Sequence, residues 1–463
     1  MNPSDKALNK IFFIGIGGSG MSGLAEVLFN LGYEISGSDI NESVITKRLQ
    51  AIGIDLSIGH KVNNVDDQDM IIKSTAIEER NVELIQARKL GLPILERAEL
   101  LSSLMNMKRG VAIAGTHGKT TTTSILASIM SEAMLDPTFI NGGIINSFAS
   151  NAKLGTGDYL LAEADESDKS FLMLQPSLEI ITNIDTDHLV NYENDFNNLK
   201  QAFIQFVKKL PFNGLLVACG DDPVVKELTG SFARKTILYG FNDNNDYVVD
   251  NYKAKFFTSE FTLTNNEGVS SNFKLNLPGK HNVLNATAAT VLAVEEGISL
   301  INIESSLEKF SGINRRMQFL GKLKEKIVID DYGHHPTEIE NTIITLKESF
   351  PEKKITMVFQ PHRFTRTKDL YWEFVKVIQL IDHLILLEIY PAGENPLPDI
   401  SSSCLLKDIK FKGLSKSELV SSNQEALELI NTYVEEEGIL LIQGAGNISE
   451  LSDLLNSEIQ NNE

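Results

Sequence analysis

The sequence predicts an α/β protein with three domains, and three observations support this fold class. Short runs of β-branched and other apolar residues alternate with amphipathic stretches along most of the chain, as in parallel α/β sheets. The length of 463 residues corresponds to about three domains at roughly 150 residues each. Two glycine-rich segments each follow an apolar run and precede a helical pattern. The domain boundaries are expected at 1–108, 109–313 and 314–463.

The expected elements follow this division. In the first domain, strands are expected at 10–14, 32–37 and 70–73, and a closing helix at 97–107. In the second, apolar runs predict strands at 110–114, 159–162, 178–182 and 215–218, and helices at 121–134 and 282–296. Alternating residues such as Phe256, Phe261 and Leu263 predict antiparallel strands between 246 and 277. In the third, strands are expected at 327–329, 355–359, 384–387 and 439–442, and the polar end 456–463 is expected to fray.

Composition and charge exclude several classes of protein. Hydrophobic residues make up 42% and charged residues 22%, which favours a globular chain over a disordered one. The net charge of −20 repels phosphate backbones, so neither nucleic acid nor an anionic membrane is expected as a partner. Two cysteines in 463 residues indicate a reducing compartment. No apolar run approaches the roughly 18 residues of a membrane span, so a cytoplasmic protein is expected.

The first glycine-rich segment is Gly15-Ile16-Gly17-Gly18-Ser19-Gly20, which matches G-x-G-x-x-G between a strand and a helix. Asp39 ends the second expected strand, where a carboxylate can bind a ribose hydroxyl. Glycines let the backbone approach a diphosphate, and the helix N-terminus supplies amide donors. The motif does not distinguish a dinucleotide from a nucleotide sugar, and a tight turn without a ligand remains an alternative.

The second segment is Gly115-Thr116-His117-Gly118-Lys119-Thr120. It lacks the first glycine of a complete Walker motif, because Ile113 stands there, but it keeps the lysine and the threonine. Backbone amides would bind phosphates, Lys119 would reach the terminal ones, and Thr120 could bind Mg²⁺.

Acidic residues follow the strand at 159–162, namely Glu163, Asp165, Glu166 and Asp168. One carboxylate after a strand of a phosphate-binding domain is expected to hold a metal ion, and the alternative is a solvated acidic loop. His188 lies among acids after the next strand, where sites of α/β proteins form. A structural role for this histidine is equally open.

Two segments of the third domain carry ionisable residues after a strand. The first is Asp330-Asp331-Tyr332-Gly333-His334-His335-Pro336, which suits a two-metal site or a substrate clamp; a helix cap by Asp331 or Thr337 is the alternative. The second runs from Gln360 to Arg366, and its arginines suit a carboxylate or a phosphate. A basic surface without a ligand is the alternative here.

Taken together, these motifs resemble the Mur ligases, the ATP-dependent amino-acid ligases of peptidoglycan precursor synthesis. The resemblance runs from about Ile11 to Ile448 and rests on the segments 15–23, 115–123, 163–168, 330–338, 360–367 and 390–394. It implies a Rossmann-like N-terminal domain, a P-loop ATPase central domain and a Rossmann-like C-terminal domain. It also implies the cofactors ATP and Mg²⁺ and small-molecule substrates.

The resemblance further implies roles for individual residues. The UDP-sugar would be bound by Gly17, Gly18, Ser19, Gly20, Met21, Asp39 and Ser74. ATP would be bound by Gly115, Thr116, His117, Gly118, Lys119, Thr120, Thr121, Asn282 and Asn285, with Arg315 or Arg316. Mg²⁺ would be held by Thr120, Glu163 and His188. The amino acid would be bound by Tyr332, His362, Arg363 and Arg366, and the catalytic set would be Lys119, Glu163, His188, His335 and Arg363.

The activity implied is the ligation of L-alanine to the lactyl carboxylate of UDP-N-acetylmuramate through an acyl phosphate. A monomer or a weak homodimer is expected. Three alternatives stay open: a ligase that attaches a whole tripeptide to the same nucleotide sugar, a nicotinamide-dependent oxidoreductase, and a non-catalytic nucleotide sensor. The oxidoreductase would leave the segment 115–120 unexplained, and the sensor would not need the clusters at 332–335 and 362–366.

Overall fold

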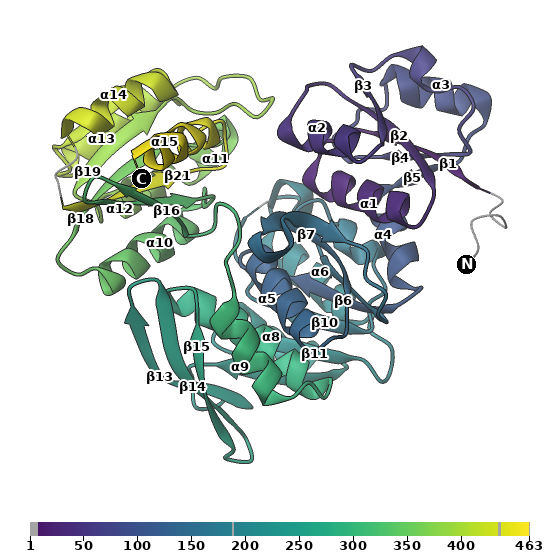
Figure 1. Cartoon of the computed structure of the whole chain (residues 1–463), viewed down its shortest axis with the longest axis horizontal. Helices are drawn as coiled ribbons and strands as arrows, with labels where there is room; N and C mark the ends of the chain where they lie inside the picture. Colours follow the sequence, from purple (N-terminus) through teal and green to yellow (C-terminus); the bar gives the residue numbers. More distant parts are fainter. Residues whose placement is uncertain (1–7, 188, 434–436, 463) are drawn as a thin grey trace. The chain divides into compact units, whose positions relative to one another are not determined.

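The computed structural model describes residues 8–187, 189–433 and 437–462, and Figure 1 shows three α/β domains along the chain. The described residues form a five-stranded, a ten-stranded and a six-stranded sheet. The α/β fold class with three domains is therefore confirmed. Among the described residues, no helix has the length and apolar character needed to cross a membrane.

The first sheet is entirely parallel, in the order β3-β2-β1-β4-β5. Its strands are β1 Lys10–Ile14, β2 Glu34–Asp39, β3 Asp55–Ile58, β4 Met70–Lys73 and β5 Ile94–Glu96. The helices are α1 Ser19–Asn30, α2 Val44–Ala51, α3 Val82–Leu90 and α4 Arg97–Met105. The strand order changes direction between β1 and β4, and this switch point places the loop after β1 where ligands of such sheets bind.

The second sheet has the order β15-β14-β13-β12-β11-β10-β6-β9-β7-β8. Its strands are β6 Arg109–Ala114, β7 Thr138–Ile145, β8 Ser150–Lys153, β9 Tyr159–Glu163, β10 Leu178–Ile181, β11 Leu215–Cys219, β12 Lys235–Gly240, β13 Tyr247–Lys255, β14 Thr258–Asn265 and β15 Ser270–Leu275. The helices are α5 Lys119–Glu132, α6 Phe196–Val207, α7 Pro223–Leu228, α8 Lys280–Glu295 and α9 Leu300–Lys309. Strands β9, β6, β10, β11 and β12 pair in parallel, while β13 and β14 are neighbours joined by two residues and are therefore antiparallel.

The third sheet has the order β16-β17-β21-β18-β19-β20, and only the β16–β17 pair is antiparallel. Its strands are β16 Gln318–Leu323, β17 Lys326–Asp331, β18 Lys354–Phe359, β19 His383–Leu387, β20 Ser417–Val420 and β21 Gly438–Gln443. The helices are α10 Pro336–Ser349, α11 Phe364–Asp369, α12 Tyr371–Ile378, α13 Ser402–Phe411, α14 Asn423–Tyr433 and α15 Ser449–Asn462. The frayed end expected at 456–463 is wrong as far as Asn462, because Leu451, Leu455 and Ile459 of α15 are buried.

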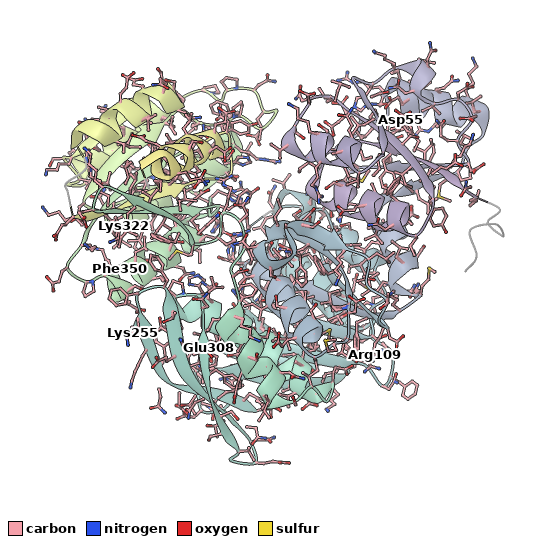
Figure 2. All side chains as sticks on the ribbon, in the orientation of Figure 1. Asp55, Arg109, Lys255, Glu308, Lys322 and Phe350 are labelled. Carbon is pink, nitrogen blue, oxygen red and sulfur yellow. The ribbon has the colours of Figure 1, made fainter. Side chains whose placement is uncertain are left out.

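The chain divides into two compact units. The first comprises 1–252, 261–275 and 284–311, and the second comprises 253–260, 276–283 and 312–463. The short segment 253–260 packs within the second unit, because the ring of Phe257 lies 5.3 Å from that of Phe350 and 4.8 Å from that of Phe319. Figure 2 labels Lys255 of this segment and Phe350. The domain limits expected from the sequence stay a prediction.

Within the first unit, one apolar core joins the first two sheets. Leu24 and Leu28 of α1 share this core with Ile140 of β7 and Ala152 of β8. A Cβ atom built on Gly23 would lie 3.2 Å from the side chains of Ile140 and Ala152, so α1 packs closely on these strands. The helix that follows the first glycine loop is therefore held against the sheet that carries the second.

Candidate active site

The loop at 115–118 joins β6 to α5. Gly115 and Gly118 have φ values of +131° and +87°, a region that glycine enters without steric cost. Asn183 holds the loop, because its Oδ1 accepts a hydrogen bond from the amide of His117 at 2.8 Å and its Nδ2 donates to the His117 carbonyl at 2.9 Å. The first turn of α5 thus begins at the carboxyl edge of the sheet, which is the arrangement that binds phosphate groups.

Lys119 lies inside this loop rather than in solvent. Its Nζ donates to the carbonyls of Gly115 and Thr116 and to Oε2 of Glu166 at 2.7 Å. Glu166 is buried, with 2% of its surface exposed. Burial lowers the pKa of Lys119, but the carboxylates of Glu166 and Asp165 outweigh it and raise the pKa above its usual value. The lysine is therefore a fixed positive charge at the phosphate loop.

Two residues expected at the metal ion lie together. A Cβ atom built on Gly142 of β7 would lie 2.9 Å from Oε1 of Glu163 and 3.2 Å from Oγ1 of Thr120. The Glu163 carboxylate also accepts a hydrogen bond from the amide of Gly142. A hydroxyl and a carboxylate oxygen at one point fit Mg²⁺, which prefers oxygen ligands. His188, the third expected ligand, lies outside the described residues.

The other residues expected at ATP divide between the two units. Asn285 of α8 lies at the loop, because a Cβ atom on Gly118 would be 2.4 Å from its Oδ1. The hydroxyl of Thr116 accepts a hydrogen bond from the amide of Asp185 at 2.9 Å, and Thr121 is buried in α5. Asn282 lies in the first turn of α8, in the part of that helix that belongs to the second unit. Its Nδ2 donates a hydrogen bond to the carbonyl of Pro278 at 2.8 Å.

The first glycine loop lies between β1 and α1. Oδ2 of Asp39 accepts a hydrogen bond from the amide of Gly17 at 2.8 Å, so this carboxylate holds the loop itself. Ser74 lies on the other side, with its Cβ 3.3 Å from the position of a Cβ on Gly15. Met21 is buried in the apolar core. For Ser19, the structure describes the backbone at the start of α1 but not the side chain.

Behind this loop lies a polar cluster that sequence reasoning missed. Glu83 is fully buried and accepts hydrogen bonds from Ser38 Oγ at 2.6 Å and Asn64 Nδ2 at 2.6 Å. His60 Nδ1 lies 2.7 Å from the same carboxylate. The carbonyl of Ser38 accepts hydrogen bonds from the amides of Gly15 and Ile16. The cluster therefore holds the loop in place through the Ser38 carbonyl. The sequence signal for this cluster was His60, two residues after the end of β3.

In the second unit, four rings form a row at the carboxyl ends of β17, β18 and β19. Tyr332 and His334 have centroids 5.4 Å apart, His334 and His362 are 5.6 Å apart, and His362 stacks on Tyr390 at 5.5 Å. The guanidinium of Arg316 lies 5.0 Å from the centre of the Tyr332 ring. The structure thus brings Tyr332 and His362 into one row through His334, and Arg316 lies at the Tyr332 end of it.

The arginines lie at the other end of this row. Nη1 of Arg366 is 3.4 Å from Nδ1 of His362. Arg363 precedes α11 with a φ of +72°, an uncommon conformation for a residue with a side chain. Glu394 accepts hydrogen bonds from the amide and hydroxyl of Thr365 and lies 4.0 Å from the Arg363 guanidinium. This carboxylate therefore fixes the start of α11 and orients its arginine.

His335 is buried and caps α10, because its Nδ1 accepts a hydrogen bond from the amide of Thr337 at 3.4 Å. The alternative of a helix cap by Asp331 or Thr337 is wrong, because the capping residue is His335. Asp331 instead accepts hydrogen bonds from the amides of Met317 and Gly333, both at 2.9 Å. These contacts hold the turn that carries Tyr332.

The two imidazoles of the row are held neutral. Burial and the positive charge of Arg366, against the opposing effect of Glu338, together lower the pKa of His334 to about 4. Burial and the charges of Arg366 and Arg363 lower the pKa of His362 to about 3. At neutral pH both rings are therefore uncharged and can accept a hydrogen bond, but they are weak bases.

Comparison with known proteins relates this geometry to one family. Three family models match in succession: the Mur ligase family catalytic domain at 10–109, the Mur ligase middle domain at 113–293, and the Mur ligase glutamate ligase domain at 315–446. The UDP-N-acetylmuramate–alanine ligase of Thermotoga maritima is 31% identical, with a TM-score of 0.85, over 98% of this chain and 100% of that one. The chain belongs to the Mur ligase family.

Other Mur ligases share the fold at lower identity. A murein peptide ligase of Psychrobacter arcticus is 23% identical, with a TM-score of 0.72, over 97% of this chain and 98% of that one. The MurF ligase of Thermotoga maritima, solved in complex with ADP, is 16% identical, with a TM-score of 0.63, over 100% of this chain and 97% of that one. As a Mur ligase, this chain is an ATP-dependent ligase of peptidoglycan synthesis.

Proposed function

We propose that this Mur ligase joins L-alanine to the lactyl carboxylate of UDP-N-acetylmuramate, giving UDP-N-acetylmuramoyl-L-alanine, ADP and phosphate. The observation that carries the proposal is the cluster of two arginines and two neutral imidazoles beside Tyr390. A small amino acid offers one carboxylate, which suits a guanidinium, and one amine, which must lose a proton. The 31% identity to an alanine ligase supports the same substrate.

The phosphate loop would position ATP. Lys119 would neutralise charge on the β- and γ-phosphates, and the amides of the first turn of α5 would bind the same groups. Thr120, Glu163 and His188 would hold Mg²⁺, which supplies further charge neutralisation to the phosphates. Because no side-chain nucleophile is required, these residues act by position and charge while the γ-phosphate passes to the lactyl carboxylate.

The alanine pocket would supply the second half of the reaction. Arg363 and Arg366 would hold the carboxylate of L-alanine, with Tyr332 beside them. A neutral His334 or His362 can accept a hydrogen bond from the alanine amine, which must first release a proton to water before it attacks the acyl phosphate. The phosphate then leaves as the amide bond forms.

The nucleotide sugar would bind in the first domain. The amides around Gly17, Gly18 and Gly20 would bind the diphosphate, and Asp39 and Ser74 line the same loop. We expect such an enzyme to work in the cytoplasm, and its loss to affect cell shape and division through the cell wall.

Phosphate release tests the proposal. The protein is incubated with ATP, Mg²⁺ and UDP-N-acetylmuramate, and single amino acids are added in turn. Release should require the nucleotide sugar and should be fastest with L-alanine. Release that is independent of the nucleotide sugar, or fastest with another amino acid, would contradict the assignment.

A further inference from the structure

Arg97, the first residue of α4, lies against the first glycine loop. A Cβ atom built on Gly20 would lie 2.9 Å from Nη1 and 3.2 Å from Cδ of Arg97. Gly20 is the second residue of α1 and the last glycine of the G-x-G-x-x-G motif. The guanidinium therefore touches the first turn of α1, and any larger residue at position 20 would displace it.

The same side chain reaches the acidic segment after β9. Nη2 of Arg97 donates to Oγ of Ser170 at 3.3 Å. One guanidinium thus lies between the loop expected at the nucleotide sugar and the segment that carries Glu163 and Glu166.

The donors of Arg97 are mostly uncommitted to protein groups. In the described part of the chain, no carboxylate lies within 4 Å of this guanidinium, whereas Arg48 pairs with Glu26 at 2.9 Å and Arg315 with Asp330 at 3.2 Å. A guanidinium has five N–H donors, and the bond to Ser170 uses one. A partly buried cation with spare donors beside a glycine loop favours an anionic ligand.

We propose that Arg97 binds the diphosphate of the nucleotide sugar at the first turn of α1, as a residue of that site beyond the glycine motif. The inference rests on the proposed function, since it needs a nucleoside diphosphate in this loop. The loop amides supply donors but no net charge, and Arg97 supplies the charge in a forked form that matches phosphate oxygens. Its bond to Ser170 ties this ligand to the segment of the central domain that carries the carboxylates.

Binding experiments on the full chain without ATP test the proposal. The probes are UDP, followed by calorimetry, and uridine, followed by ligand-observed NMR. In Arg97→Gln the dissociation constant for UDP should rise roughly 10- to 100-fold, because a charged hydrogen bond is lost, while that for uridine stays within about twofold. The dissociation constant of Arg97→Lys for UDP should lie between those of the wild type and Arg97→Gln, because lysine keeps the charge but loses the paired N–H donors of the guanidinium. The matched control is Arg80→Gln, an exposed arginine of the same domain, which should bind UDP as the wild type does.

The outcomes separate the two proposals. Unchanged UDP binding by Arg97→Gln, or an equal loss of UDP and uridine binding, overturns the role of Arg97. The proposed ligase function is not contradicted by either result. A wild-type chain that binds neither UDP nor UDP-N-acetylmuramate overturns both proposals. If Arg97→Gln does not melt cooperatively, Arg97→Lys and Gly20→Ala give the same comparison, since the added methyl group displaces the guanidinium. Unchanged UDP binding by those two variants is then the contradicting result.

Discussion

At the scale of the residue, the ion pair between Lys119 and Glu166 fixes the position of the lysine ammonium in the glycine loop. The motif predicted the lysine, but its partner lies 47 positions away and is brought there because β9 pairs with β6. The spacing of Glu163 and Glu166 alone could not tell which faces the lysine and which faces Thr120. The structure separates them, since Glu166 binds Lys119 and Glu163 lies at Gly142 with Thr120.

Replacing Lys119 with alanine should lower turnover by at least ~100-fold, because a positive charge on the transferring phosphate is lost. Binding of UDP-N-acetylmuramate, measured by calorimetry, should be nearly unchanged, since that site lies in another domain. Ligase activity within twofold of the wild type would remove Lys119 from the mechanism.

Arg366→Lys should raise the KM for L-alanine roughly tenfold or more, and that for ATP far less. Lysine keeps the charge but loses the forked geometry that holds a carboxylate. Steady-state kinetics with each substrate varied in turn measures the difference. The exposed Lys368 of the same helix, changed to Arg, is the matched control. Equal changes in both KM values would assign Arg366 a structural role.

Glu179 of β10 is a buried carboxyl outside the candidate site. It is fully buried, and neither carboxylate oxygen has a hydrogen-bond partner in the described part of the chain. Burial raises its pKa well above the usual value, with only a partial opposing effect of Arg234. The unfolded chain therefore releases this proton at a lower pH than the folded chain, and the free energy of unfolding should fall as pH rises above the usual carboxyl pKa.

Glu179→Gln should remove that dependence and stabilise the chain at pH 8 by on the order of 1–3 kcal/mol. Urea unfolding at pH 5 and pH 8 measures the change in the free energy of unfolding between these pH values. The control is Glu304→Gln at an exposed glutamate. If the wild type and Glu179→Gln lose the same stability between the two pH values, the carboxyl is not neutral in the folded chain.

At the scale of the element, buried parallel strands were predictable and short or mixed ones were not. Strands such as β1 and β6 are continuous apolar runs because helices cover both faces of the sheet. The strands β3 and β5 were not expected, since Asp55–Ile58 and Ile94–Glu96 are short and largely exposed or half-buried. The polar end from Asn456 was expected to fray, yet it continues α15, in which the spacing of Leu451, Leu455 and Ile459 gives a buried stripe.

The pairing of β7 beside β9 places Gly142 at the candidate metal site. Gly142→Ala would put a methyl group 2.9 Å from Glu163 Oε1, so the carboxylate must move away from Thr120. We expect a several-fold higher Mg²⁺ concentration for half-maximal activity, with recovery at high Mg²⁺. Gly230→Ala, where no atom lies within 4 Å, is the matched control. An unchanged Mg²⁺ titration would place the metal ion away from Glu163.

At the scale of the whole molecule, candidate binding residues follow strands of each of the three sheets. Sequence reasoning expected them there, because parallel strands of one sheet end at a shared carboxyl edge. It did not find residues whose role depends on tertiary packing, such as Arg97 beside Gly20 or Glu394 beside Thr365. Such contacts join segments far apart in the sequence and leave no local pattern.

In the proposed function, the pocket at Arg363 and Arg366 selects the amino-acid substrate. Two arginines and a row of rings suit one small carboxylate and one amine, and a longer peptide acceptor would carry further charges into the same space. A ligase that attaches a whole tripeptide to the nucleotide sugar is therefore the alternative to distinguish.

A direct competition makes that distinction. The protein is given ATP, Mg²⁺ and UDP-N-acetylmuramate with equal concentrations of L-alanine and the tripeptide L-alanyl-γ-D-glutamyl-meso-diaminopimelate, and the products are identified by mass spectrometry. UDP-N-acetylmuramoyl-L-alanine should be the dominant product, and its formation should fall in Arg366→Lys. A dominant tripeptide product would mean that the pocket at Arg363 and Arg366 binds a peptide and that the L-alanine assignment is wrong.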